Sequence, residues 1–223
     1  MELLTDRSDV AEIARLIEES VTGYEPADFP DQCWVLHELT RRDPGDPAAT
    51  PLRVTWADAL DRHGYRLADW RFTLSDLTLA PAAGDPGVEL PREGQLDRDS
   101  LAALLSVLAR QSDRGLDTVC YWAQCPLEDL LNPVPIRTGT LREALDLFDR
   151  LGTPGHPFTF PANWWPADRS WFVLTDTDLS ATEVLGSAEL VAAVLAETGL
   201  EAVRHPRIAD SPEGAAAWPP LAH

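Results

Sequence analysis

The sequence predicts one globular domain of the α/β or α+β class, with a mixed sheet and amphipathic helices. Three observations favour this class: apolar residues recur at helical spacing, short aromatic and β-branched runs lie between those segments, and Pro- and Gly-rich stretches separate them. A chain of 223 residues with 44% hydrophobic content can enclose one sizeable core. We assign residues 1–208 to the domain and expect the Pro-rich, aperiodic residues 209–223 to form a flexible tail.

The first half predicts three helices separated by extended segments. Cap residues and a C-terminal glycine set the helix bounds, and buried apolar runs mark the strands. The expected elements are a helix over 9–21 capped by Ser8, a strand over 33–36, a helix opened by Thr55 and stopped by Gly64, strand character over 70–79, a loop over 81–94 and a helix beginning near Ser100.

The second half shows similar signals in nearly the same order. Thr140 and Glu143 have the spacing of a capping box, in which each side chain pairs with the other residue's backbone N–H. The expected elements are a strand over 119–122, a helix opened by Thr140 and ended by Gly152, strands over 158–161 and 170–175, and a helix capped by Ser187.

Two pairs of segments resemble each other across the chain. Thr55–Leu60 matches Thr140–Leu145, and Trp70–Leu74 resembles Trp171–Leu174. Such matches are typical of an internal duplication, here with halves near 30–112 and 116–208. Capped helices and aromatic strands also recur in unrelated α/β proteins, and the offsets here are not constant, so both interpretations stay open.

Charge is the strongest indication of the kind of partner. The chain contains no lysine, its formal net charge is −19 at pH 7, and all 18 basic residues are arginine. Missing lysine excludes a Walker-type phosphate site and Schiff-base chemistry. Binding to nucleic acid or to an anionic membrane is disfavoured, because both need clustered positive charge. A basic protein partner is favoured, although net charge also serves solubility alone.

Cysteine and histidine spacing favours a protein without cofactors. Three cysteines form no even disulfide framework, and the sequence start lacks a signal-peptide pattern, so we expect a cytoplasmic location. No apolar run is long enough to span a bilayer. We expect no metal and no organic cofactor, because neither residue type has ligand spacing. The cysteines are Cys33, Cys120 and Cys125, and the histidines are His37, His63, His156, His205 and His223.

No motif identifies a catalytic centre. Asp176 and Asp178 are spaced like a metal-binding pair, but the preferred interpretation is a strand end at which Asp178 or Ser180 caps the next turn. There is no G-x-S-x-G nucleophile motif, although a triad can assemble from distant positions. An enzyme or small-molecule-binding protein with a cleft between the two halves therefore stays as the alternative.

Tryptophans concentrate in residues 161–178. Neighbouring Trp164 and Trp165 face opposite ways on an extended chain, so we expect one of them to be exposed. Residues 161–185, with the run Trp165–Trp171, the downstream Asp176–Thr182 and Gly186-Ser187, resemble uncharacterised actinobacterial proteins, some of which look like immunity proteins of toxin systems. The resemblance implies no catalytic residues.

These observations favour an acidic module that binds a basic protein, such as a nuclease toxin that it would occlude. Residues 9–31 carry the most one-sided charge of the first half, and the tryptophan region offers aromatic contact area. The oligomeric state cannot be read from the sequence. The predicted partner-binding residues are Glu12, Glu18, Glu19, Glu25, Asp28, Asp31, Trp164, Trp165 and Asp168.

Overall fold

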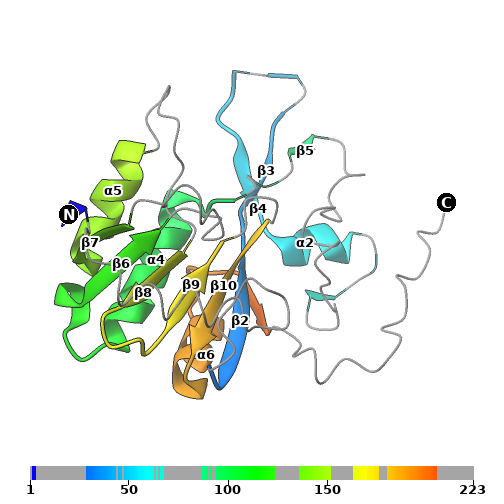
Figure 1. The fold of residues 1–223 in the computed structure, drawn as a ribbon. Helices are drawn as coiled ribbons and strands as arrows, with labels where there is room; N and C mark the ends of the chain where they lie inside the picture. The colour runs from blue at the N-terminus through cyan, green and yellow to red at the C-terminus, as the bar shows by residue number, and fades with distance from the viewer. Residues whose placement is uncertain are drawn as a thin grey trace, which may run out of the picture.

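The structure is a computed structural model; it describes residues 2–3 by their backbone and residues 29–43, 45–46, 48–62, 64, 66–67, 87–89, 91, 94–123, 136–151, 163–175 and 180–204. The strands are β1 (Glu2–Leu3), β2 (Asp31–Leu36), β3 (Leu39–Arg41), β4 (Leu52–Val54), β5 (Val88–Glu89), β6 (Val119–Ala123), β7 (Ile136–Thr140), β8 (Asn163–Pro166), β9 (Phe172–Leu174), β10 (Ala181–Gly186) and β11 (Ala202–Arg204). The helices are α2 (Trp56–Asp61), α4 (Arg98–Arg110), α5 (Ala144–Leu151) and α6 (Ala188–Leu195), with the 3-10 turns η3 (Gly115–Asp117) and η4 (Leu141–Glu143). Figure 1 shows their arrangement.

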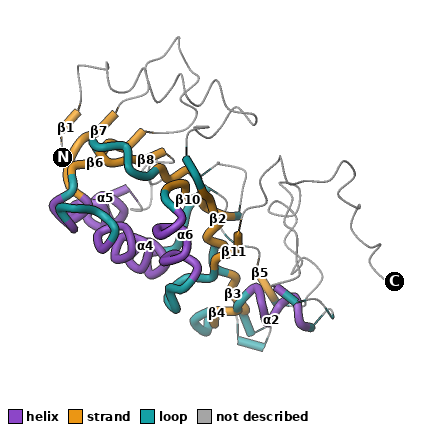
Figure 2. Tube along the Cα trace, turned by 90° about the horizontal axis from the view of Figure 1, so that it is seen from below, coloured by secondary structure: helices purple, strands orange, loops and turns teal. Residues whose placement is uncertain are grey.

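The strands form two sheets. The larger has eight strands in the order β1-β7-β6-β8-β9-β10-β2-β11, and the smaller has the order β4-β3-β5. Every pairing among the described strands is antiparallel. Helices α4, α5 and α6 lie together on one face of the large sheet (Figure 2). The fold is therefore of the α+β class.

The two sheets share one stretch of chain. β2 ends at Leu36 and β3 begins at Leu39, so the chain passes directly from the large sheet into the small one (Figure 1). Helix α2 packs beside the small sheet through the buried residues Trp56 and Ala59. The small sheet and α2 thus form a second layer of structure attached at the end of β2.

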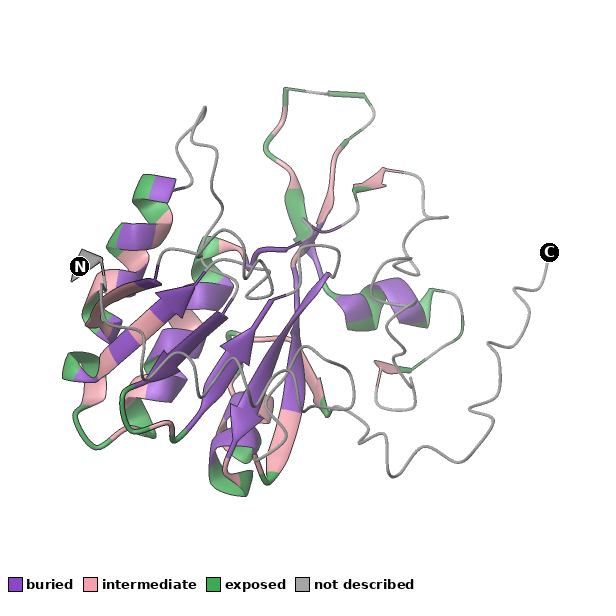
Figure 3. Ribbon diagram, viewed as in Figure 1, coloured by how far each residue is buried: buried purple, intermediate pink, exposed green. Residues whose placement is uncertain are grey.

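The main core lies between the large sheet and its helices. Alternate strand residues, including Val35, Trp122, Trp164 and Val184, point to this side and pack against apolar residues of the helices. Figure 3 shows that the sheet-facing side of these helices is buried, whereas their outer side is exposed. Apolar residues that recur about every 3.6 positions in the helices therefore pack against residues that recur every second position in the strands.

The opposite face of the large sheet carries a second buried cluster. It includes Trp165, Phe172, Leu174 and Leu185, and the Trp165 ring stacks on Phe172 with centroids 5.7 Å apart. Strands of this sheet are therefore apolar on both faces. Ala181–Gly186, for example, is buried at every position.

The predicted helix caps are largely confirmed. The Asp58 N–H donates to Thr55 Oγ1 at 2.9 Å, and the Leu190 N–H donates to Ser187 Oγ at 3.2 Å. The Thr140 N–H donates to Glu143 Oε2 at 2.8 Å within the predicted capping box.

The helix that was expected to begin near Ser100 is confirmed. α4 begins at Arg98, and its cap is Asp97, which accepts the N–H groups of Asp99 and Ser100. Aspartate is among the preferred residues at this position.

Several strands lack a prediction. β1, β3, β4, β7, β8, β10 and β11 have no counterpart among the expected elements, and β5 lies inside the predicted loop over 81–94. The helix over 9–21, the strands over 70–79 and 158–161, Gly152 and the tail over 209–223 lie outside the described residues.

The internal duplication is not confirmed. Among the described elements, β2 of the first half lies between β10 and β11 of the second, while β3, β4 and β5 form the separate small sheet. The matched segments Thr55–Leu60 and Thr140–Leu145 also pack in different places, beside the small sheet and on the large sheet respectively.

Within the described part of the chain, no helix combines the length and the apolar character needed to cross a bilayer.

Candidate functional site

A cluster of buried polar side chains lies where β2, β9 and β10 end or begin. His37 follows β2, Thr175 follows β9, and Thr182 is the second residue of β10. Antiparallel pairing of β10 with both neighbours brings these positions together, since Ala181 lies opposite Leu36. We call His37, Thr175, Thr182 and the nearby Gln95 the polar cluster.

The polar cluster contains a short chain of hydrogen bonds. His37 Nε2 lies 3.0 Å from Thr182 Oγ1, which lies 2.7 Å from Thr175 Oγ1. The indole Nε1–H of Trp56 donates to the His37 carbonyl at 2.7 Å and fixes the backbone at this point. An imidazole and two hydroxyls in series can pass a proton along the chain. All three side chains are buried, with Thr175 6% exposed, so the chain has little access to solvent.

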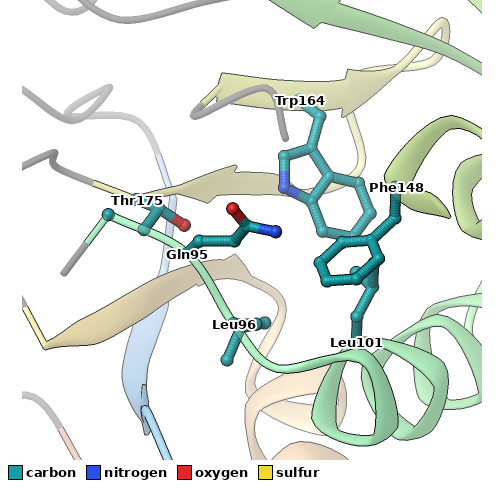
Figure 4. A pocket seen from close by; sticks show the side chains of 7 residues that line it. Gln95, Leu96, Leu101, Phe148, Trp164 and Thr175 are labelled. Atoms are coloured by element: carbon teal, nitrogen blue, oxygen red, sulfur yellow. The ribbon is translucent and has the colours of Figure 1, made fainter. Parts of the chain in front are cut away.

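Gln95 lines a small, partly open cavity beside Thr175 (Figure 4). Phe148, Trp164 and Leu101 form its apolar walls. The space measures about 10 Å³, which admits about one water molecule and nothing larger. As it stands, the polar cluster therefore offers no room for an organic substrate.

The two described cysteines are buried thiols on the helix-facing side of the large sheet. Desolvation, together with the negative charges of Glu183 and Asp31, raises the pKa of Cys33 to about 12. Burial also raises the pKa of Cys120. Both thiols stay protonated near neutral pH and are therefore poor nucleophiles and poor metal ligands.

The part of the chain that the structure describes contains no group of three or more histidine, cysteine or carboxylate side chains that could hold a metal ion. The other proposed candidates, namely Cys125, His63, His156, His205, His223, Asp176 and Asp178, lie outside the described residues.

A larger concave surface lies on the helical side of the molecule. It has a volume of about 450 Å³ and lies between α4, the turn at η3, η4 and α5. We call it the helix groove. The lining residues are Ala102, Leu105, Ser106, Ala109, Arg110, Leu116, Leu141, Arg142 and Leu145.

The helix groove has an apolar floor and a charged rim. Leu116, 40% exposed, is one of two large hydrophobic side chains that are exposed in the described ranges; the other is Leu52 on β4. At the rim, Arg110 pairs with Glu197 at 2.7 Å and Arg142 with Asp117 at 3.0 Å. Asp117 and Arg142 are 66% and 61% exposed, and ion pairs this accessible are weak and readily exchanged.

The predicted partner-binding residues do not gather at one described place. Asp31 begins β2 and accepts two bonds from Arg204 Nη1, at 2.7 and 2.6 Å, so its charge is already paired. Asp168 lies in the exposed turn between β8 and β9, where it accepts from the N–H and hydroxyl of Ser170. The residues Glu12, Glu18, Glu19, Glu25 and Asp28 lie outside the described part of the chain.

The expectation that one of Trp164 and Trp165 is exposed is wrong. Trp164 and Trp165 point to opposite faces of the sheet as predicted, but each is only 1% exposed. Trp164 packs edge-on against Trp171 with centroids 5.5 Å apart, while Trp165 stacks on Phe172 on the other face. β8 is a central strand with both faces buried, which the sequence pattern did not show.

The sequence analysis predicted neither the polar cluster nor the helix groove. His37 was one of five scattered histidines, and only pairing with β10 brings it to Thr182. The apolar residues of the helix groove belong to helices whose apolar faces also fill the core, so the pattern did not separate them from buried residues.

Comparison of the chain with protein-family models, with curated proteins and with solved structures gives no significant match.

Proposed function

We propose that this protein is an acidic protein-binding module whose partner is a basic protein. In its specific form, the proposal is a cytoplasmic immunity protein that occludes a basic toxin such as a nuclease. The helix groove is the observation that carries it, because it is the described surface with the shape and chemistry of a docking site.

The size and lining of the helix groove suit one or two side chains of a partner. Its volume of about 450 Å³ falls in the range of ordinary binding pockets, and most of its lining residues are apolar. The exposed Leu116 side chain would lose its contact with water on docking, and such burial stabilises a complex by roughly 25 cal/mol per Å². An apolar anchor of the partner would therefore insert between α4 and η4.

Charge decides which residues should flank that anchor. The whole chain has a net charge of −19, and the exposed Asp117 carboxylate at the rim is held only by an exposed arginine. A lysine or arginine of the partner could take over this carboxylate at little cost. Long-range attraction between an acidic protein and a basic one also speeds association.

A pair of leucine variants tests the groove. Leu116→Arg places a charge in the helix groove, whereas Leu52→Arg changes the other exposed leucine, on β4 of the small sheet. Partners captured from the native host by each variant and by the wild type would be identified by mass spectrometry, purified and measured for affinity. We expect a partner with net positive charge, bound by the wild type and by Leu52→Arg but at least tenfold more weakly by Leu116→Arg.

Two results would contradict this proposal. A captured partner that binds Leu116→Arg and wild type equally well would remove the helix groove from the interface. An acidic partner, or a complex whose association rate does not fall as salt increases, would contradict the proposed electrostatic attraction.

The acidic N-terminal segment is the second part of the proposed interface. Reversing Glu18, Glu19 and Asp28 to arginine should slow association with the purified partner at low salt, because long-range electrostatic attraction acts mainly on the association rate. The free energy of unfolding should stay nearly unchanged. Unchanged association would mean that this segment is not a docking surface.

The alternative is an enzyme or small-molecule-binding protein. The hydrogen-bonded chain of His37, Thr182 and Thr175 is the observation in its favour. A biosynthetic operon around the gene would support this alternative, whereas a basic toxin gene immediately upstream would support the immunity function. His37→Gln should leave partner affinity unchanged if the protein acts through the helix groove.

A further inference from the structure

The small cavity beside the polar cluster has the properties of a binding site for a single polar molecule. It lies between Gly94–Leu96, the start of α4, α5 and the end of β9, and encloses about 10 Å³. A space of this size holds one water molecule if at least two polar groups face it. Gln95 and Thr175 are the polar side chains of its lining (Figure 4).

Gln95 supplies the first of these groups. The residue is only 4% exposed, and its Oε1 atom is buried without a hydrogen-bond partner among the described residues. Figure 4 shows the amide group directed into the space between Thr175, Trp164 and Phe148. A buried carbonyl oxygen with no partner is costly, so a native structure normally provides one.

Thr175 supplies the second group. Its hydroxyl has one proton and two lone pairs, and one of these sites is taken by Thr182 Oγ1 at 2.7 Å. The hydroxyl therefore retains capacity to pair with a second molecule in the cavity. Whether Thr175 donates to Thr182 or accepts from it depends on the His37 ring, which contacts Thr182 Oγ1 at 3.0 Å.

We propose that the cavity binds one ordered water molecule, which bridges Gln95 Oε1 and Thr175 Oγ1. Water suits both groups, because it donates to the Gln95 carbonyl and either donates to or accepts from the Thr175 hydroxyl. An anion would face the Gln95 carbonyl oxygen without a positive charge to balance it, and a larger ligand does not fit the volume.

The bridging water extends the hydrogen-bonded chain of the polar cluster. The chain then runs from Gln95 through water, Thr175 and Thr182 to His37. It connects the segment that leads into α4 with the adjoining ends of β2, β9 and β10. The water is thus a structural bridge between the helical layer and the centre of the large sheet.

Crystal structures at high resolution test the site directly. The wild type should show one water within hydrogen-bond distance of both Gln95 Oε1 and Thr175 Oγ1. Thr175→Val removes the hydroxyl at almost constant volume, and we expect it to lose this water. Thr175→Ser keeps the hydroxyl and should keep the water, so it is the matched control.

A solution measurement accompanies the crystals. In the wild type, the side-chain amide protons of Gln95 should show a nuclear Overhauser effect to a long-lived water, and Thr175→Val should lack it. If Thr175→Val does not fold, Gln95→Met, which removes the other polar group, should show the same loss of water in its crystal structure. A dry cavity in the wild type, or a water that persists unchanged in the valine or methionine variant, would overturn the proposal.

Discussion

Two segments with similar sequences, Thr55–Leu60 and Thr140–Leu145, begin their helices in different ways. At the start of η4, which leads into α5, Glu143 accepts the N–H of Thr140 at 2.8 Å. The acceptor at this helix start therefore lies only three residues along the chain. In α2, the carboxylate of Glu201 accepts the N–H groups of Trp56 and Ala57 at 2.7 and 2.8 Å, from 145 and 144 residues away.

The difference shows that one local signal can serve two kinds of attachment. The capping box of Thr140 forms wherever its own residues are helical, because the hydrogen bonds between Thr140 and Glu143 join residues three positions apart. The N-terminus of α2 instead depends on Glu201 being held between α6 and β11, and α2 is only six residues long. A helix this short is not stable by itself, so its position depends on tertiary contacts.

Removing the tryptophan of α2 should have the largest effect on this comparison. Trp56 is fully buried, packs against the β2 and β3 cluster and donates to the His37 carbonyl. We expect Trp56→Ala to lower the free energy of unfolding by about 3–5 kcal/mol, as is usual for a truncated core aromatic. Chemical denaturation would measure it, with Leu52→Ala as the exposed control, expected within about 0.5 kcal/mol of wild type. A loss below about 1 kcal/mol would mean that α2 is not an integral part of the core.

Removing the long-range cap should have the next largest effect. Glu201→Ala leaves two N–H groups of α2 without their acceptor, and we expect a loss of about 2 kcal/mol. Asp149→Ala, which breaks the exposed ion pair with Arg98, is the matched carboxylate control and should cost no more than about 1 kcal/mol. Equal losses in the two variants would show that Glu201 is not a specific attachment of α2.

Replacing the threonine caps should lower the free energy of unfolding by different amounts in the two helices. Thr140→Ala is expected to destabilise the protein by about 1 kcal/mol, the usual cost of losing an N-cap. Thr55→Ala should cost less, about 0.5 kcal/mol, because Glu201 still holds the first two N–H groups of α2. Denaturant midpoints at unchanged slope would give both values. A larger loss for Thr55→Ala than for Thr140→Ala would reverse the ranking of the two attachments.

The smallest expected effect is a pH dependence that belongs to Glu201. Desolvation raises its pKa above the ordinary 4.5, and the N–H groups of Trp56 and Ala57 oppose that rise only partly. A carboxyl with a raised pKa in the folded state binds its proton more tightly than in the unfolded chain, so its contribution to stability falls as pH rises from about 4.5 through the folded pKa.

Glu201→Gln isolates this contribution, because all other carboxyls are the same in both proteins. The stability of wild type relative to Glu201→Gln should decline between pH 4 and the folded pKa and then level off. A relative stability that rises over this interval would mean that the N–H groups outweigh desolvation and that the pKa of Glu201 is lowered.

The sequence by itself determined the features whose causes are local. The caps at Thr55, Thr140 and Ser187 and the last four residues of β2 were predicted correctly, because hydrogen bonds within one turn and a short apolar run specify them. The α+β class was among the predicted classes for the same reason. Net charge and missing lysine restrict the function without reference to any fold.

Only the tertiary structure decided which residues meet. β10 was not recognised as a strand, yet it pairs with a strand on both sides and is buried at every position. Its place inside the sheet results from hydrogen-bonded pairing with β2 and β9 rather than from its own sequence. The burial of both Trp164 and Trp165, the meeting of His37 with Thr182 and the attachment of α2 by Glu201 all depend on contacts between distant residues. Local propensity carries no information on such contacts, because sheet pairing and burial are properties of the assembled layers rather than of any one segment.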